Sequence, residues 1–218
     1  MSDPIFAEID EEVRRERYKQ LWAQYGTYVV AGVFVIVLGI GGWRGYQWWE
    51  ARKAAEAGAA FEAAVTLVDD DKHAEAEAAF AKIAADAPSG YRILARLREA
   101  ASLAQRDPKA AAKIYDQVAT DSGAGQVLQD LANLRAGMAL ADTESYDALL
   151  ARLEPLTGAD RAFRHTAREL LAFAAWRGNN SEAIKRWAEM IVTDGETPAS
   201  TRSRIDMLMA LTGTQAKG

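Results

Sequence analysis

A run of uncharged residues near the start of the chain dominates its hydrophobic pattern. Leu21 to Trp43, LWAQYGTYVVAGVFVIVLGIGGW, holds no charged side chain, and Val29 to Ile40 is almost wholly aliphatic, aromatic or glycine. A helix of this length rises by about 34 Å, enough to cross the hydrocarbon core of a bilayer. No later stretch approaches eighteen uncharged apolar residues. The pattern therefore predicts one transmembrane helix, with bounds 21–47.

Aromatic and basic residues flank the run at both ends, which is typical of the interfaces of a membrane helix. The expected interfacial anchors are Trp22, Tyr25, Tyr28, Trp43, Arg44, Tyr46, Trp48 and Trp49. A cleaved signal peptide is the main alternative, but it would start with a short basic segment and end at small residues. Here a long acid-rich stretch precedes the run and bulky aromatics follow it. We therefore expect an uncleaved anchor.

Small residues recur at four-residue spacing within the anchor. Gly41 and Gly45 form a GxxxG spacing, which lets a second membrane helix approach closely. Glycine is also generally frequent in membrane helices, so the spacing has a second explanation. Helix packing at these two glycines is therefore a hypothesis about a partner helix.

The first twenty residues, 1–20, have the pattern of a short amphipathic helix that leads into the anchor. Asp10 and Arg14, like Glu11 and Arg15, stand four residues apart with the acid first, which is the more stabilising order. Four basic side chains precede the anchor and three follow it. This difference leaves the orientation open under the positive-inside rule, with a slight preference for a cytoplasmic N-terminus.

The remaining segment, 48–218, is rich in alanine and other helix formers and shows no strand pattern. Pro108 and Pro198 fit the first position of a helix, and Asn180 or Ser181 fits an N-cap. Turn-forming residues divide the segment into predicted helices near 48–69, 72–86, 90–105, 108–121, 126–141, 145–155, 161–177, 181–194 and 198–212. The predicted fold class is all-α.

A small residue followed four positions later by an aromatic one recurs along these helices. The second such pair follows the first by 35 residues, and the third follows the second by 72, about twice that period. A middle copy near 147–151 lacks the aromatic residue. This period resembles the tetratricopeptide repeat, in which the small residue permits close helix approach and the aromatic fills the gap to the next unit. The expected repeat-packing residues are Ala76 and Phe80, Ala111 and Tyr115, Ala183 and Trp187, together with Pro88.

The other helical aromatics fit the same solenoid. Phe61, Phe173 and Trp176 stand at helical spacing among alanines, so we expect them in the core rather than in a ligand site. The last helix places Thr201 to Arg204 opposite Ile205, Leu208 and Met209. That arrangement predicts a C-terminal cap on the repeat solenoid.

Composition excludes several functional classes. The net charge is −5 and no basic block occurs, so binding to nucleic acid is not expected. No cysteine is present, which excludes disulfides and thiolate chemistry. His73 and His165 have no metal-ligand partner at helical spacing and are expected at the surface. Since no nucleotide-binding or hydrolase motif occurs, we expect no catalytic residue, cofactor, metal or small-molecule substrate, and hence no enzyme.

The segment before the anchor, IFAEIDEEVRRERYKQLWAQYG, is the most distinctive part of the chain. Followed by one anchor and a degenerate repeat domain, it resembles the bacterial YfgM-like family, whose best-known members are ancillary subunits of the SecYEG translocon. The resemblance implies a single-pass inner-membrane protein with a cytoplasmic arm at 1–20 and a periplasmic domain at 48–218. It also implies association with the translocon, periplasmic chaperones or exported polypeptides.

The leading functional hypothesis is a membrane-tethered protein-interaction scaffold, whose solenoid presents a concave face to polypeptides. One alternative is a regulatory tether that restrains a cytoplasmic stress-response factor through the N-terminal arm, and another is an assembly factor for envelope complexes. Arginines on the leading helices are candidate partner contacts, with ordinary solvated arginines as the competing interpretation. These residues are Arg92, Arg96, Arg135 and Arg168.

Overall fold

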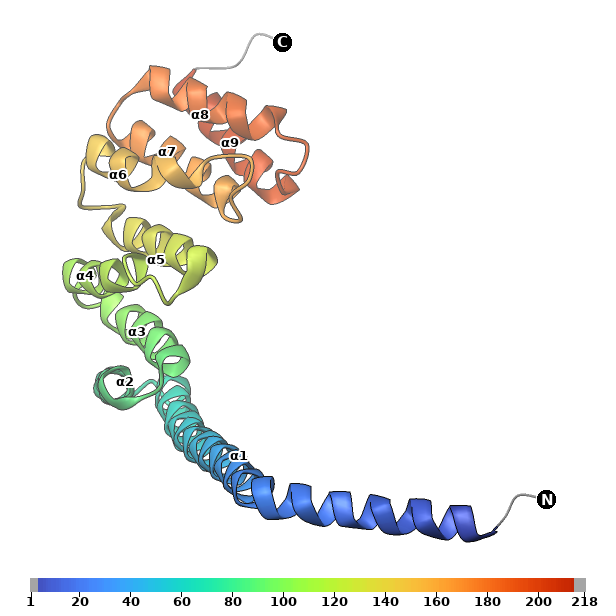
Figure 1. Cartoon of the computed structure of the whole chain (residues 1–218). Coiled ribbons are helices and arrows are strands. Elements are labelled where there is room, and N and C mark those ends of the chain that lie inside the picture. The colour runs from blue at the N-terminus through green and yellow to red at the C-terminus, as the bar shows by residue number, and fades with distance from the viewer. Residues whose placement is uncertain (1–3, 214–218) are drawn as a thin grey trace. The chain divides into compact units, whose positions relative to one another are not determined.

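The computed structural model describes residues 4–213, with side chains from residue 14 onward. Within that range the chain forms nine α-helices, one 3₁₀ helix and no strand (Figure 1), which confirms the predicted all-α class. The α-helices are α1 (Pro4–Asp69), α2 (His73–Asp86), α3 (Ser89–Ala104), α4 (Pro108–Ala119), α5 (Gly125–Leu140), α6 (Tyr146–Leu153), α7 (Arg164–Arg177), α8 (Ser181–Thr193) and α9 (Ala199–Thr212). The 3₁₀ helix η1 spans Glu154–Leu156.

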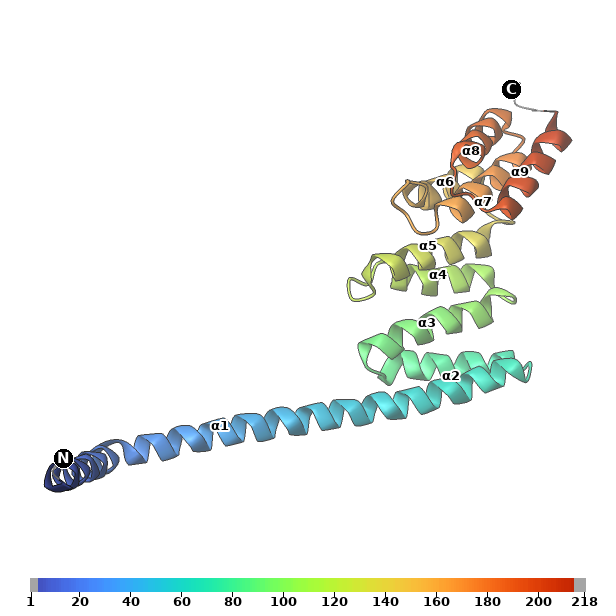
Figure 2. The same ribbon diagram turned by 90° about the vertical axis from the view of Figure 1, so that its right-hand side faces the viewer.

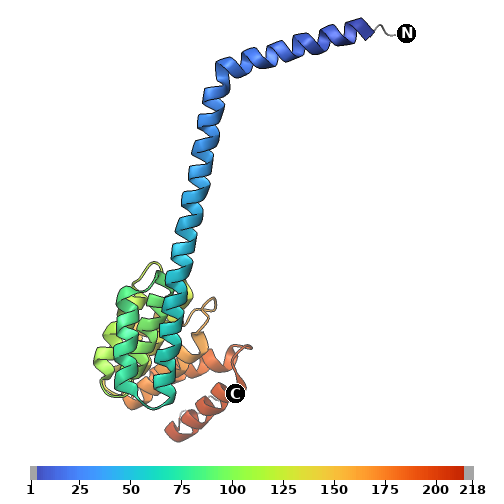
Figure 3. The same cartoon turned by 90° about the horizontal axis from the view of Figure 1, so that it is seen from below.

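The first helix is longer than the sequence pattern indicated. We expected a new helix to begin near residue 48, whereas α1 continues without a break to Asp69 (Figure 3). The chain has no proline between Pro4 and Pro88, so no residue in this stretch lacks the backbone N–H that a helix requires. Among the described residues, α1 is the one helix long and apolar enough to cross a membrane by length and composition.

Residue contacts divide the chain into two compact units, 1–53 and 54–218. The first unit consists of the N-terminal part of α1, and its apolar side chains are exposed from Val29 to Ile40. The second unit contains the end of α1 and all the later helices. Within it each helix from α2 to α9 packs against the next one along the chain (Figure 2). α7 also contacts α5, α9 and η1.

Small and aromatic side chains form the contacts between paired helices. Ala76 and Phe80 of α2 are fully buried against Ala64 of α1. The ring of Phe80 meets that of Phe61 edge-on, with centroids 5.4 Å apart, a favoured aromatic geometry. The equivalent residues Ala111 and Tyr115 of α4, and Ala183 and Trp187 of α8, are also buried, and Pro88 precedes α3 as its N-cap.

The middle repeat packs leucine side chains in place of the alanine and the aromatic ring of the other repeats. The buried pair on α6 is Leu149 and Leu153, two residues later than the expected copy near 147–151, where Asp147 and Ala151 are exposed. Gly137 of α5 faces Leu153: a Cβ atom on this glycine would lie 2.8 Å from Leu153 Cδ2. The missing side chain on α5 therefore makes room for the leucine on α6.

The last helix closes the stack with its apolar side. Ile205, Leu208 and Met209 are buried as expected for a cap. Thr201, expected on the polar side, is buried as well, and its hydroxyl donates to Glu169 Oε2 of α7 at 3.3 Å. Arg204 forms an ion pair with the same carboxylate. Two polar bridges to α7 thus supplement the apolar contacts of α9.

Candidate protein-interaction groove

A groove of about 640 Å³ lies beside α7, next to the C-terminal end of α5. Its lining residues are Ala141, Asp142, Leu170, Phe173, Ala174, Trp176, Arg177 and Asn179. Leu170, Phe173 and Arg177 recur at helical spacing, so they project from one side of α7. The surface of the groove is predominantly apolar, which is the usual character of a site that takes up side chains of a partner.

Trp176 is the main exposed aromatic residue of the groove. The sequence pattern predicted a core position, but 47% of its surface is accessible. The prediction was wrong because periodicity identifies a helix face without telling which face is covered by a neighbour. Tryptophan in an apolar depression is the residue type most enriched at energetically dominant positions of protein interfaces. Trp176 therefore makes this groove the strongest candidate for partner binding.

Polar contacts fix the rim of the groove. Arg177, the last residue of α7, donates from Nη1 to the carbonyl oxygen of Asp142 at 2.9 Å and from Nη2 to that of Glu144. Both carbonyls belong to the connection between α5 and α6. Gly178 follows as the C-cap of α7, and Asn180 then caps α8 by accepting from the backbone N–H of Ala183 at 3.0 Å. The expected cap at Asn180 is thereby confirmed.

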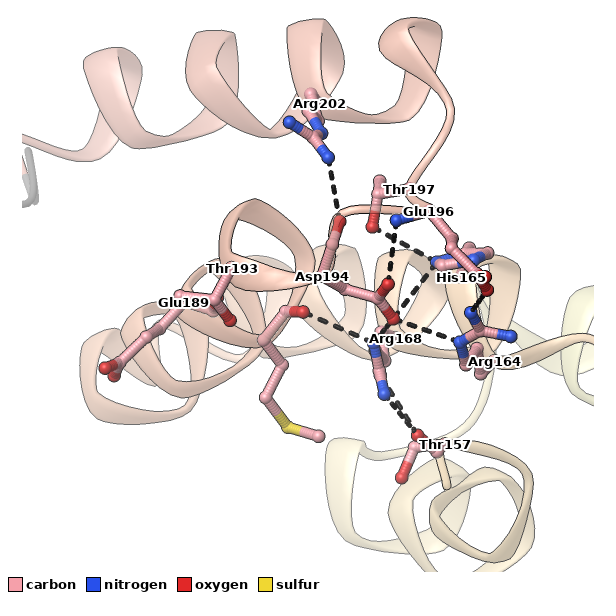
Figure 4. Close-up of polar contacts among 11 residues, drawn as sticks. Thr157, Arg164, His165, Arg168, Glu189, Thr193, Asp194, Glu196, Thr197 and Arg202 are labelled. Atoms are coloured by element: carbon pink, nitrogen blue, oxygen red, sulfur yellow. Dashed lines mark hydrogen bonds and ion pairs between the residues drawn. The ribbon is translucent and has the colours of Figure 1, made fainter. Parts of the chain in front are cut away.

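A second polar cluster holds α7 from its other end (Figure 4). Arg168 is buried, and its Nε and Nη2 donate to the carbonyl oxygen of Thr157 at 3.0 and 2.8 Å. Its Nη1 donates to the carbonyl oxygen of Met190 at 3.2 Å and to Asp194 Oδ2 at 2.8 Å. One guanidinium thus ties α7 to η1, to α8 and to the turn before α9.

Asp194 is the acceptor on which this cluster converges. Its Oδ2 receives a further hydrogen bond from Arg164 Nε at 3.0 Å, and Oδ1 accepts the backbone N–H of Glu196 at 3.0 Å. These hydrogen bonds, with that of Arg168, lower the pKa of the Asp194 carboxyl far below its usual range. Arg202 of α9 donates to the Asp194 carbonyl at 2.8 Å, which attaches the cap to the same turn.

His165 lies beside this cluster rather than at the open surface. Its Nδ1 is 3.1 Å from Thr197 Oγ1 and 3.8 Å from Asp194 Oδ2, and its side chain is mostly covered. Burial lowers the pKa of His165, and the positive charge of Arg164 lowers it further. The expected surface position is therefore wrong for His165, whereas His73 is close to Asp71 and remains substantially exposed.

The four arginines proposed as partner contacts occupy different environments. Arg168 is buried in the Asp194 cluster, so its predicted solvated position is wrong. Arg96 forms an ion pair with Asp121 at 3.5 Å. Arg92 is half-buried, and its Nε is buried without a hydrogen-bond partner in the described part of the chain. Arg135 is exposed on α5. Arg168 is therefore not available at the surface, and partner contacts at Arg92, Arg96 and Arg135 stay a prediction.

The predicted interfacial residues lie on α1. Trp22, Tyr25, Tyr28, Trp43, Tyr46, Trp48 and Trp49 are exposed, and Arg44 is exposed among them. Lys53 Nζ lies 3.9 Å from the ring centroid of Trp49, and the guanidinium carbon of Arg52 lies 5.6 Å from that of Trp48. Among the described residues, no atom outside the helix lies within 4 Å of the place where a Cβ on Gly41 or Gly45 would stand. Helix packing at these glycines stays a prediction.

Comparison with known proteins agrees with this architecture. The family profile described as "Tetratricopeptide repeat-like domain" matches residues 19–191. A protein of Haemophilus influenzae named "Ancillary SecYEG translocon subunit" is similar, with 24% identity over 150 residues, which cover 69% of this chain and 74% of that protein. No solved structure matches the chain. Because the profile spans most of the chain and the helix pairs stack as repeats, the chain belongs to the tetratricopeptide repeat-like domain family.

Proposed function

We propose that this protein is a membrane-anchored interaction scaffold that serves as an ancillary subunit of a SecYEG-type translocon. The observation that carries the proposal is the apolar groove of α7 with its exposed Trp176, in a chain that also contains a span suited to crossing a bilayer. The printed name of the similar Haemophilus influenzae protein supports the translocon as the partner complex. Anchoring raises the local concentration of the groove near anything docked in the same membrane.

In this proposal the arm at 1–20 lies in the cytoplasm and the repeat domain lies in the periplasm. There the groove receives segments of newly exported polypeptides or of periplasmic chaperones. A reporter enzyme fused to the C-terminus tests the orientation, since it should be active only on the periplasmic side. Activity of the fusion in the cytoplasm would refute the compartment assignment.

Photo-cross-linking in native membranes tests the partner assignment. A photoreactive residue replaces Trp176 in the groove, and in a matched control it replaces Met207, which is exposed on α9 away from the groove. We expect translocon subunits or exported chains among the neighbours of the groove position and not of the control. If both positions yield the same neighbours, the groove is not the interaction site.

Deletion of residues 1–17 distinguishes the scaffold hypothesis from the regulatory-tether hypothesis. Loss of co-purification with the translocon assigns the arm a docking role within the scaffold. Loss of a stress phenotype alone, with translocon association intact, would instead identify the arm as a regulatory tether.

A further inference from the structure

We infer that the groove beside α7 selects polypeptide segments in which a lysine or arginine neighbours a large apolar side chain. The inference rests on the proposed scaffold function and adds the chemistry of the bound segment. In the bound state the apolar side chain lies on Leu170 and Phe173, and the cationic tip lies between the Asp142 carboxylate and the Trp176 ring.

The floor of the groove takes up apolar side chains. Leu170 and Phe173 are half-buried, Ala174 is buried, and Trp176 stands exposed beside them. Because Ala174 has only a methyl group, the surface is hollowed between the larger side chains. Covering this surface removes apolar area from water and favours binding by about 25 cal/mol per Å² before the costs of association.

The charges at the groove favour a cation. Asp142 is exposed, and its carboxylate has no hydrogen bond or ion pair within the described residues. Among the described residues, Arg177 is the one cation that lines the groove, and two backbone carbonyls already accept from its guanidinium. The lining thus holds one acid and one cation, and of the two only the Asp142 carboxylate has no bonded partner among the described residues.

Aromatic and amide groups complete the recognition of a cation. A lysine or arginine tip over the face of an indole gains about 0.5–1 kcal/mol at an exposed site. The Asn179 side chain also lines the groove and has no hydrogen bond in the described part of the chain, so its carbonyl oxygen is available to accept one. Lysine and arginine lay their methylene stems along apolar surface while the charged tip stays in water. These residues therefore match a groove with an apolar floor and an unpaired carboxylate, that of Asp142, at its rim.

Three synthetic peptides of about a dozen residues, long enough to follow a groove of this kind, test the inference. The first combines leucine and phenylalanine with lysine, the second replaces each lysine with glutamate, and the third replaces each apolar residue with serine. Each is immobilised, and binding of the full chain in lipid nanodiscs is measured by surface plasmon resonance. We expect the first peptide to bind about five- to tenfold more tightly than the second, and the third to bind weakest.

Four variants assign the effect to the groove. Asp142→Lys should make the glutamate peptide bind more tightly than the lysine peptide. Asp206→Lys, at an exposed position of α9, should leave the lysine peptide as the tighter binder. Trp176→Ala should weaken both apolar peptides, whereas Met207→Ala should not. Circular dichroism verifies that each variant remains folded, and Trp176→Tyr, which keeps an aromatic face, should retain most of the binding.

The outcomes distinguish the inference from the proposed function. Equal binding of the lysine and glutamate peptides to the unmodified chain would overturn the charge selection while leaving an apolar interaction groove in place. Unchanged binding of all peptides to Trp176→Ala would remove the groove itself as the site, and both proposals would fail. A preference for lysine that persists in Asp142→Lys would assign the selection to another surface and overturn the inference.

Discussion

Gly137 and Leu153 show how a single missing side chain sets the spacing of two helices. The leucine is fully buried and approaches the glycine so closely that an added Cβ would be 2.8 Å from its Cδ2. Real Cβ atoms do not tolerate such a contact, and a buried leucine has no open space into which it can turn. The size of the residue at position 137 therefore decides whether α5 and α6 keep their distance.

We predict that Gly137→Ala destabilises the repeat domain by about 1–3 kcal/mol despite the higher helix propensity of alanine. Urea denaturation followed by circular dichroism measures the change. Gly90→Ala in α3 is the matched control, because among the described residues no atom beyond its own helix turn lies within 4 Å of its Cβ position, and it should not destabilise. Equal stability of the two variants would mean that α5 and α6 adjust without cost.

Trp187 depends on one hydrogen bond. Its indole Nε1 donates to the Tyr146 hydroxyl at 3.0 Å, and the tryptophan is fully buried. Tyr146→Phe leaves this N–H without an acceptor, so we predict a loss of about 1–3 kcal/mol. Tyr91→Phe is the control, because the Tyr91 hydroxyl makes no hydrogen bond in the described residues. If both variants lose the same free energy of unfolding, the cost comes from removing a tyrosine hydroxyl in general and not from breaking the hydrogen bond to Trp187.

At the scale of elements, α7 is held at both ends by arginines. Arg177 binds the connection between α5 and α6, while Arg164 and Arg168 bind the turn around Asp194. Replacing one partner of such a cluster leaves the other polar groups unsatisfied. Asp194→Asn should therefore loosen the turn and α9. Hydrogen exchange is expected to rise in α9 and the α8–α9 turn, and to stay unchanged in α2 and α3.

The same cluster gives the domain a defined pH dependence. The pKa of Asp194 is lowered in the folded chain, so its stabilisation is present above about pH 4 and is lost as the pH falls below it. The pKa of His165 is also lowered, so the unfolded chain binds its proton first and stability declines as the pH falls below about 6.5.

We predict that His165→Gln removes the decline that begins below about pH 6.5 and that Asp194→Asn removes part of the steeper decline below about pH 4. Unfolding midpoints measured across this range check both. His73→Gln serves as the control at an exposed position. A decline near pH 6 that survives in His165→Gln would assign the titration to another group.

The helices of the repeat domain could be predicted from sequence because turn residues and capping residues are local signals. Pro108 opens α4 and Asn180 caps α8 as expected. The sequence did not reveal which side of α7 is covered, since Trp176 and Trp187 have the same local pattern and only Trp187 is buried. It also did not reveal the partners of Arg168, because Thr157 and Asp194 lie 11 and 26 residues away along the chain.

At the scale of the whole molecule, the uncharged part of α1 is the segment suited to crossing a membrane. Each aspartate at the centre of a membrane helix costs about 2.5–3.5 kcal/mol on insertion. We therefore predict that the double variant Val35→Asp, Ile36→Asp is extracted from membranes by alkaline carbonate, while Val35→Leu, Ile36→Leu remains bound. Retention of the aspartate variant in the membrane fraction would show that other segments bind the membrane.

The tryptophans divide into two groups with a practical consequence. Five are exposed, namely Trp22, Trp43, Trp48, Trp49 and Trp176, and Trp187 alone is fully buried. Excited indole emits at longer wavelength when it is surrounded by water, and a dissolved quencher reaches only exposed rings. A variant with phenylalanine at the other four positions keeps only Trp176 and Trp187. In its fluorescence spectrum, the short-wavelength emission of Trp187 reports the packing of the repeats. The emission of Trp176, which a dissolved quencher can reduce, reports occupancy of the groove. The protein thus carries its own optical readout for folding and for partner binding.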